Sequence, residues 1–188
     1  MLTTLTELDA INQILSAIGS DPVMSLEDNL DIDIVNARRL LLDTSRTIQR
    51  QGWDFNKVTK TLNPDKDTKK ISWDNTIISL TSDDDNTYVK RGEYLYDLTN
   101  DTYEFDKGIE VTIIYGVDFE DLPDCFKNYV TAKTALDFQS RYFGDTTVTQ
   151  DLSMAMQMAW QDIVSYDINM SDANALQFTA VSEVLQRT

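Results

Sequence analysis

The feature that most constrains the fold is a helical repeat that stops at one glycine and gives way to an aromatic segment. Ile34, Leu41 and Ile48 recur at a spacing of seven residues, with Val35 and Leu42 beside them. Residues three, four and seven apart share one face of a helix, so this spacing predicts an amphipathic helix. Gly52 stands where a left-handed helix cap is expected, and Trp53 follows where a hydrophobic contact usually accompanies that cap.

Helical periodicity along the chain predicts four helices, this one at residues 31–51 and three others at 7–18, 123–144 and 148–168. The segment between the second and third alternates in hydrophobicity and is rich in β-branched and aromatic residues, which is typical of strands. We expect short strands at 58–62, 71–73, 76–80, 88–90, 94–97 and 109–115, with a tight hairpin turn at Arg91 and Gly92. Thr6 and Asp9 have the spacing of a capping box at the first helix.

These elements predict an α+β fold: a four-helix bundle with an inserted antiparallel β-sheet domain and an extended C-terminal tail. The expected domains are residues 1–53 and 119–172 for the helical bundle, 54–118 for the inserted β domain and 173–188 for the tail. The fourth helix has an expected core stripe of Leu152, Ala155, Met156, Ala159, Trp160 and Ile163.

Charge narrows the possible functions. The formal net charge is −16, and no Lys or Arg precedes Arg38. Binding to a nucleic-acid backbone needs many basic side chains to neutralise phosphates, so a broad nucleic-acid grip is not expected. Simple solubility explains an acidic surface, and so does a channel wall that repels DNA.

The chain has few of the residue types that catalytic and metal-binding sites use. The chain has no histidine and a single cysteine, Cys125, which removes His-based triads and the ligands of a zinc site. No glycine-rich phosphate loop occurs, and the aspartates at 65–67 and 83–85 lack the glycine and distant glutamate of an EF-hand. We expect no catalytic site, no cofactor, no metal and no membrane span. Cys125 is expected to be a small core residue on a helix.

Several segments in order along the chain resemble one family. They are the opening helix (8–15 and 18–19), the loop at 22–23, the helix and cap at 37–56, the strand-turn-strand at 88–97, the strand at 105–114, and the segments 122–126 and 138–144 that bracket a helix. Together they resemble the tail tubular protein A family, the head-to-tail adaptors of T7-like short-tailed bacteriophages.

That resemblance implies a non-enzymatic structural ring subunit in about twelve copies. Its implied partners are the portal protein, the tail nozzle (tail tubular protein B) and the tail fibre. DNA would pass through the lumen without specific binding. The implied location is the virion, at the junction of head and tail, with the host cytoplasm as the site of assembly.

Three groups of residues are candidates for contacts. The basic side chains Arg38, Arg39, Arg46 and Arg50 are predicted to form salt links inside or between subunits rather than to bind DNA. Gly52, Trp53 and Phe55 are predicted to form the hinge packing between bundle and sheet. The apolar tail residues Phe178, Val181, Val184 and Leu185 are candidates for docking to the portal, because an apolar terminal strip needs burial.

Two other functions remain open from the residues alone. A carboxylate-dependent glycan hydrolase in the tail would place two carboxylates in one cleft, with a raised pKa on one of them. An acidic DNA mimic would stay monomeric and ignore a portal ring.

Overall fold

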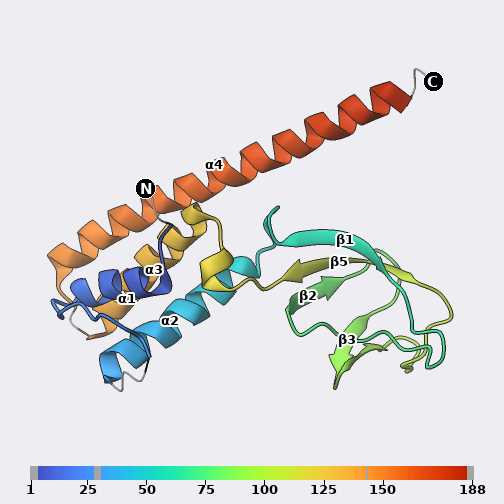
Figure 1. The fold of residues 1–188 in the computed structure, drawn as a ribbon, viewed down its shortest axis with the longest axis horizontal. Coiled ribbons are helices and arrows are strands. Elements are labelled where there is room, and N and C mark those ends of the chain that lie inside the picture. Colours follow the sequence, from blue (N-terminus) through green and yellow to red (C-terminus); the bar gives the residue numbers. More distant parts are fainter. Residues whose placement is uncertain (1–3, 28–30, 143, 186–188) are drawn as a thin grey trace. The chain divides into compact units, whose positions relative to one another are not determined.

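The computed structural model describes the backbone of residues 4–27, 31–142 and 144–185, and the side chains within these ranges up to residue 171. The chain forms two compact units (Figure 1). Unit 1 comprises residues 1–48 and 118–188, and unit 2 comprises residues 49–117. The fold is mixed α+β, with four α-helices and small antiparallel sheets.

The first helix of unit 1, α1 (Glu7–Ser16), begins at a capping box, as predicted. The Thr6 hydroxyl accepts a hydrogen bond from the Asp9 amide at 3.1 Å, and the Asp9 carboxylate accepts one from the Thr6 amide at 3.2 Å. Both orphan amides at the helix start are therefore satisfied. The helix ends two residues before the expected position.

The second helix, α2 (Ile32–Gln49), buries the predicted seven-residue stripe. Ile34, Leu41 and Ile48 are all buried, together with Ala37 between them. The periodicity of the sequence therefore gives the correct core face. Val35 and Leu42 point away from that core and are about half exposed.

The third and fourth helices pack together through aromatic side chains. Helix α3 (Asp124–Tyr142) follows a short 3₁₀ turn, η1 (Phe119–Asp121), and buries Phe126 and Phe138 completely. Across the helix pair, the Phe126 ring lies 6.0 Å from that of Tyr166, and the Tyr129 ring lies 5.3 Å from that of Trp160. Cys125, expected in the core, is only half-buried beside this contact.

Helix α4 (Thr146–Leu185) is much longer than predicted. The expected end near residue 168 and the separate extended tail at 173–188 are wrong for the backbone, since the helix continues to Leu185. Asp172 and Asn174 suggested a break, but such residues cost a helix only tenths of a kcal/mol, and no Gly or Pro follows Gly144. Ala155, expected in the core stripe, is exposed, whereas Ala159 and Ile163 are buried.

Unit 2 contains two antiparallel sheets. In the first, β5 (Ile109–Tyr115) lies between β1 (Lys57–Leu62) and β2 (Ile77–Thr81). The second is the hairpin of β3 (Tyr88–Arg91) and β4 (Tyr94–Asp97). The tight turn predicted here is present one residue later, at Gly92 and Glu93. Gly92 has a φ of +62°, which a hairpin turn of this kind requires at its first central residue.

The single inserted sheet of the prediction is therefore two sheets. Residues 71–73, expected as a strand, form only an isolated bridge between Ser72 and Tyr94 beside β4. The segment is short because the chain turns on both sides of it. Lys69 adopts a positive φ of 56°, and the Asp74 carboxylate accepts a hydrogen bond from the Thr76 amide at 2.9 Å, as in an Asx-turn.

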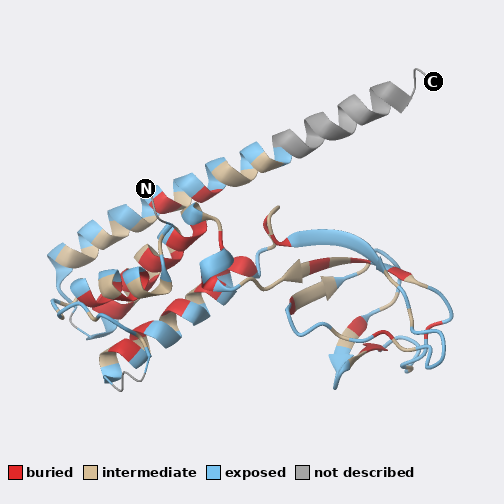
Figure 2. Cartoon of the chain, viewed as in Figure 1, coloured by how far each residue is buried: buried red, intermediate tan, exposed pale blue. Residues whose placement is uncertain are grey.

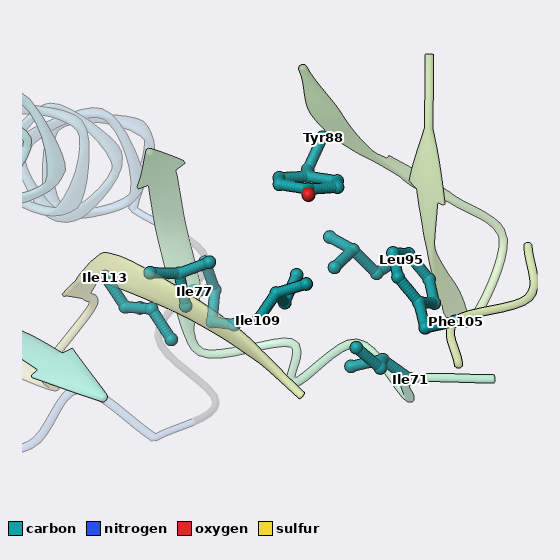
Figure 3. Close-up of a cluster of buried hydrophobic side chains, with 8 residues drawn as sticks. Ile71, Ile77, Tyr88, Leu95, Phe105, Ile109 and Ile113 are labelled. Carbon is teal, nitrogen blue, oxygen red and sulfur yellow. The ribbon is translucent and has the colours of Figure 1, made fainter. Parts of the chain in front are cut away.

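The two sheets share one hydrophobic core (Figure 3). Strand β5 alternates in burial, so that Ile109, Val111 and Ile113 point inward. Leu95 and Tyr88 from the hairpin face them, and two loop residues, Ile71 and Phe105, close the cluster. Because residues from both sheets and from the loops build this core, unit 2 has the packing of a small independent domain.

Candidate interaction surfaces

A buried polar cluster, here called the clasp (Gln49, Trp53, Asn56, Tyr115 and Val117), joins the two ends of unit 2. The Asn56 side chain, 4% exposed, lies at its centre. Its amide nitrogen donates to the carbonyl oxygens of Gln49 at 3.0 Å and of Tyr115 at 2.8 Å. Its side-chain oxygen accepts a hydrogen bond from the Trp53 amide at 2.9 Å. One side chain therefore holds three backbone groups that come from both ends of the insertion.

Gln49 adds a second link in the clasp. Its side-chain nitrogen donates to the Val117 carbonyl at 2.9 Å, and its side-chain oxygen accepts from the Val117 amide at 2.7 Å. The chain enters unit 2 at Gln49 and leaves it at Val117, so both connections between the units start from this cluster. Buried amides of this kind are costly unless they are paired, and the four bonds from Gln49 and Asn56 to Val117, Tyr115 and Trp53 all reach backbone groups.

Of the predicted hinge residues, Trp53 belongs to the clasp, and Gly52 and Phe55 lie beside it in sequence. Gly52 has a φ of +78°, which confirms the left-handed cap. A Cβ atom there would lie 2.7 Å from the Ile114 Cδ1 atom. Trp53 is buried and Phe55 is half-buried. Their hinge role stays a prediction. Gln49 and Asn56 were not predicted, because an amide side chain near a helix end gives no sign of burial in the sequence.

The four candidate arginines do not form one cluster. Arg38 is paired within its own chain, since its Nε donates to the Glu7 carboxylate at 2.8 Å. This hydrogen bond raises the pKa of Arg38. Arg39 instead lines a shallow hollow together with Arg141 and Tyr142. Arg46 and Arg50 are exposed, and the structure leaves an inter-subunit role for all four as a prediction.

Unit 2 carries a surface where cations lie over tyrosine rings. The Arg91 guanidinium lies 3.8 Å from the centre of the Tyr96 ring, and the Lys70 ammonium lies 5.1 Å from that of Tyr94. The Tyr96 hydroxyl donates a hydrogen bond to Asp101. Such cation–π contacts hold basic side chains against the hairpin. Tyr96 is buried and Tyr94 is half-buried, so this part of unit 2 presents basic side chains above largely covered rings.

The loop before β3 is fixed by a tyrosine. The Tyr88 hydroxyl donates to the Asp84 carboxylate at 2.7 Å. Burial, and then this hydrogen bond, raises the pKa of Tyr88 to about 12, and the same bond lowers the pKa of Asp84. Asp84 also lines a hollow with Asp83 and Glu110, where three carboxyl groups lie close together.

The carboxyl groups give no support to a general acid. Among the described residues, every carboxyl whose pKa is clearly shifted has it lowered, which is the reverse of the raised pKa that a glycosidase acid needs. In each case the first cause is a hydrogen bond that stabilises the carboxylate: to Asp9 from Thr6, to Asp65 from Thr68, to Asp74 from Thr76, to Asp84 from Tyr88 and to Asp106 from Lys69.

Neither a metal-binding cluster nor a membrane-spanning helix occurs among the described residues. Residues 4–27, 31–142 and 144–171 contain no group of three or more Cys, Asp or Glu side chains placed to hold a metal ion. No helix in the part of the chain that the structure describes is both long and apolar enough to span a membrane. The portal candidates Phe178, Val181, Val184 and Leu185 lie beyond the residues whose side chains are described.

Comparison with known proteins agrees with the order of the sequence motifs. The model of a family described as tail tubular protein matches residues 8–173. A curated relative, tail tubular protein A of Klebsiella phage KP34, is 34% identical over 141 residues, which cover 70% of this chain and 72% of that protein.

Proposed function

This chain belongs to the tail tubular protein family, so it is a structural protein of a phage tail, and from that membership we propose that it is an adaptor ring subunit between portal and tail nozzle. The observation that carries the proposal is the family match over residues 8–173, which takes in both compact units. The resemblance inferred from the sequence is thereby confirmed at the level of the family. The ring, its partners and its channel are our proposal.

The two units suit two different contacts. We assign the four helices of unit 1, as a bundle, to side-by-side packing in a ring of twelve copies and to the portal. The apolar residues near the C-terminus, Phe178, Val181, Val184 and Leu185, are the proposed portal contacts. We assign unit 2, with its cation-bearing tyrosine face, to the nozzle and the tail-fibre layer. Separate cores support this division, because each unit can then present its own surface without distorting the other.

The acidic composition suits a channel. A formal charge of −16 on each chain gives the assembly a strongly negative field, which opposes adhesion of the DNA backbone. The exposed arginines are too few to neutralise a tract of phosphates. We propose that DNA passes through the ring without specific binding, and that the subunit works in the virion after assembly in the host cell.

Particle mass tests this function. Native mass spectrometry would be applied to the chain alone and to the chain mixed with the portal ring of the same phage. Addition of about twelve subunits of 21.5 kDa to the portal is the expected result. A chain that stays monomeric and leaves the portal mass unchanged would refute the adaptor function and would favour an acidic mimic.

A further inference from the structure

The outer side of α2 is an exposed strip that is both apolar and basic. Ile32, Val35 and Leu42 are 72%, 50% and 45% exposed, and Arg39 and Arg46 lie on the same face. These five positions recur at spacings of three and four residues and follow one exposed side of the helix, beside the buried stripe. Neither arginine forms an ion pair with any residue in the described part of the chain. We call this strip the α2 face.

The outer side of α4 is also apolar, but it is acidic. Met154, Met158 and Ile168 are 61%, 67% and 56% exposed, and Asp151 and Asp162 flank them. The helix contains no Lys or Arg anywhere between Thr146 and Leu185. Flexible methionines on an exposed helix face are typical of surfaces that bind another helix. We call this strip the α4 face.

The two faces lie on opposite sides of unit 1. Figure 1 shows α4 along one side and α2 along the other, with α1 and α3 between them, and α3 packs against both α4 and α1. The outer sides of both helices are exposed in Figure 2. Unit 1 has seven basic and nineteen acidic residues, so a basic strip on this unit is unusual and calls for an acidic partner.

We propose that the α2 face of one copy binds the α4 face of the next copy. Charge complementarity selects this pairing: two α2 faces would bring arginines together, and two α4 faces would bring aspartates together, which costs free energy in both cases. Apolar side chains at the centre of each strip supply the buried area. Unlike faces on opposite sides of one unit produce a head-to-tail contact, which closes into a ring when the rotation per subunit is right.

This inference rests on the proposed ring, and it gives the arginines a role inside the wall. Arg39 and Arg46 would face Asp151 and Asp162 of the neighbouring copy. They would then be neutralised and would not attract DNA. Arg141, which lines the hollow beside Arg39, adds a third basic group next to the same contact. The lumen would keep its net negative charge because the basic side chains are used between subunits.

Charge reversal of each face, alone and together, tests the contact. The α2 reversal is Arg39→Glu with Arg46→Glu, and the α4 reversal is Asp151→Lys with Asp162→Lys. Each is expected to lower the number of subunits added to the portal at a given concentration by roughly tenfold or more, because like charges then meet across the interface. The combined variant, with all four changes, restores opposite charges and is expected to add to the portal again.

The combined variant excludes the portal as the partner of the α2 face. The portal is unchanged throughout, so a loss that the α4 reversal repairs must come from contacts between copies. Lys66→Glu with Lys107→Glu makes the same charge change as the α2 reversal on exposed residues of unit 2, and it should leave addition intact. Circular dichroism checks that each variant is folded.

Each outcome has one meaning. If the α2 reversal variant adds to the portal as efficiently as the wild type does, the pairing is overturned and the adaptor function still stands. Loss in both single reversals without recovery in the combined variant also overturns the pairing. Failure of the wild-type chain itself to add to the portal refutes the proposed function instead.

Discussion

Replacing Asn56 with alanine removes the centre of the clasp and should destabilise unit 2. The change leaves three backbone groups without this partner: the Trp53 amide and the carbonyls of Gln49 and Tyr115. The Gln49 carbonyl keeps a second donor, the Gly52 amide at 3.1 Å, so its loss costs little. The Trp53 amide and the Tyr115 carbonyl each lose a hydrogen bond, and such a loss costs about 1–3 kcal/mol for a buried group. Because the bond to Tyr115 is only partly buried, we expect a total loss of about 2–4 kcal/mol.

The magnitude can be measured by urea unfolding, followed by circular dichroism and by tryptophan fluorescence. Trp53 and Trp73 both lie in unit 2, so fluorescence reports largely on this unit. Asn75→Ala is the matched control, because Asn75 is exposed and accepts one hydrogen bond, from the Lys90 ammonium at 2.9 Å. Its expected effect is below about 0.5 kcal/mol.

The reasoning fails if Asn56→Ala and Asn75→Ala destabilise the protein equally. Hydrogen exchange gives a second readout. The Trp53 amide donates to the Asn56 side-chain oxygen at 2.9 Å, so it should exchange faster in Asn56→Ala while the amides of β5 keep their protection.

Three further predictions follow from the local geometry. Gly52→Ala should lower the free energy of unfolding by about 1–2 kcal/mol through the positive φ alone. Adding Ile114→Val removes the Cδ1 atom that the new Cβ would meet. Full recovery of stability in that double variant would show that the clash, and not the φ, caused the loss. Stability should fall as pH rises from about 10 towards 12, because Tyr88 ionises in the unfolded chain first while its pKa in the folded state is about 12. The free energy of unfolding, measured with urea, should fall less between about pH 10 and pH 11 in Tyr88→Phe than in Tyr142→Phe. An equal fall in the two variants would contradict the assignment to Tyr88. Thr6→Ala should lower stability by about 1 kcal/mol through loss of the cap, whereas Thr6→Ser should keep it; thermal unfolding distinguishes them, and equal losses would argue against the cap.

An element can be predicted from the sequence when it buries one face in a single core, because its apolar residues then recur at a regular spacing. The repeat of Ile34, Leu41 and Ile48 defines α2, and the alternation of Ile109, Val111 and Ile113 defines β5, because only one face of each element is buried. The end of α4 could not be predicted in this way. Asp172 and Asn174 separate its distal apolar residues from the predicted core stripe, and residues of this kind are compatible with helix as well as with extended chain, so local composition does not decide between the two.

Interaction surfaces are harder to predict than elements. Burial of Asn56 and Gln49 depends on backbone groups more than fifty residues away in sequence, at Tyr115 and Val117, and no local pattern specifies that meeting. Likewise, the sequence shows that Arg38 and Arg39 lie on one helix. Only the fold shows that Arg38 turns to Glu7 while Arg39 faces outward.

The clasp also bears on how such a protein can change over evolutionary time. Gln49 and Val117 exchange two hydrogen bonds, so the start and the finish of unit 2 lie within bonding distance of each other. A domain whose ends meet can be exchanged for a different one, or replaced by a short turn, with little entropic consequence for the host chain. The clasp is therefore a site where one inserted domain can be replaced by another. Related phages could vary the distal module to suit another tail and leave the helical part unaltered.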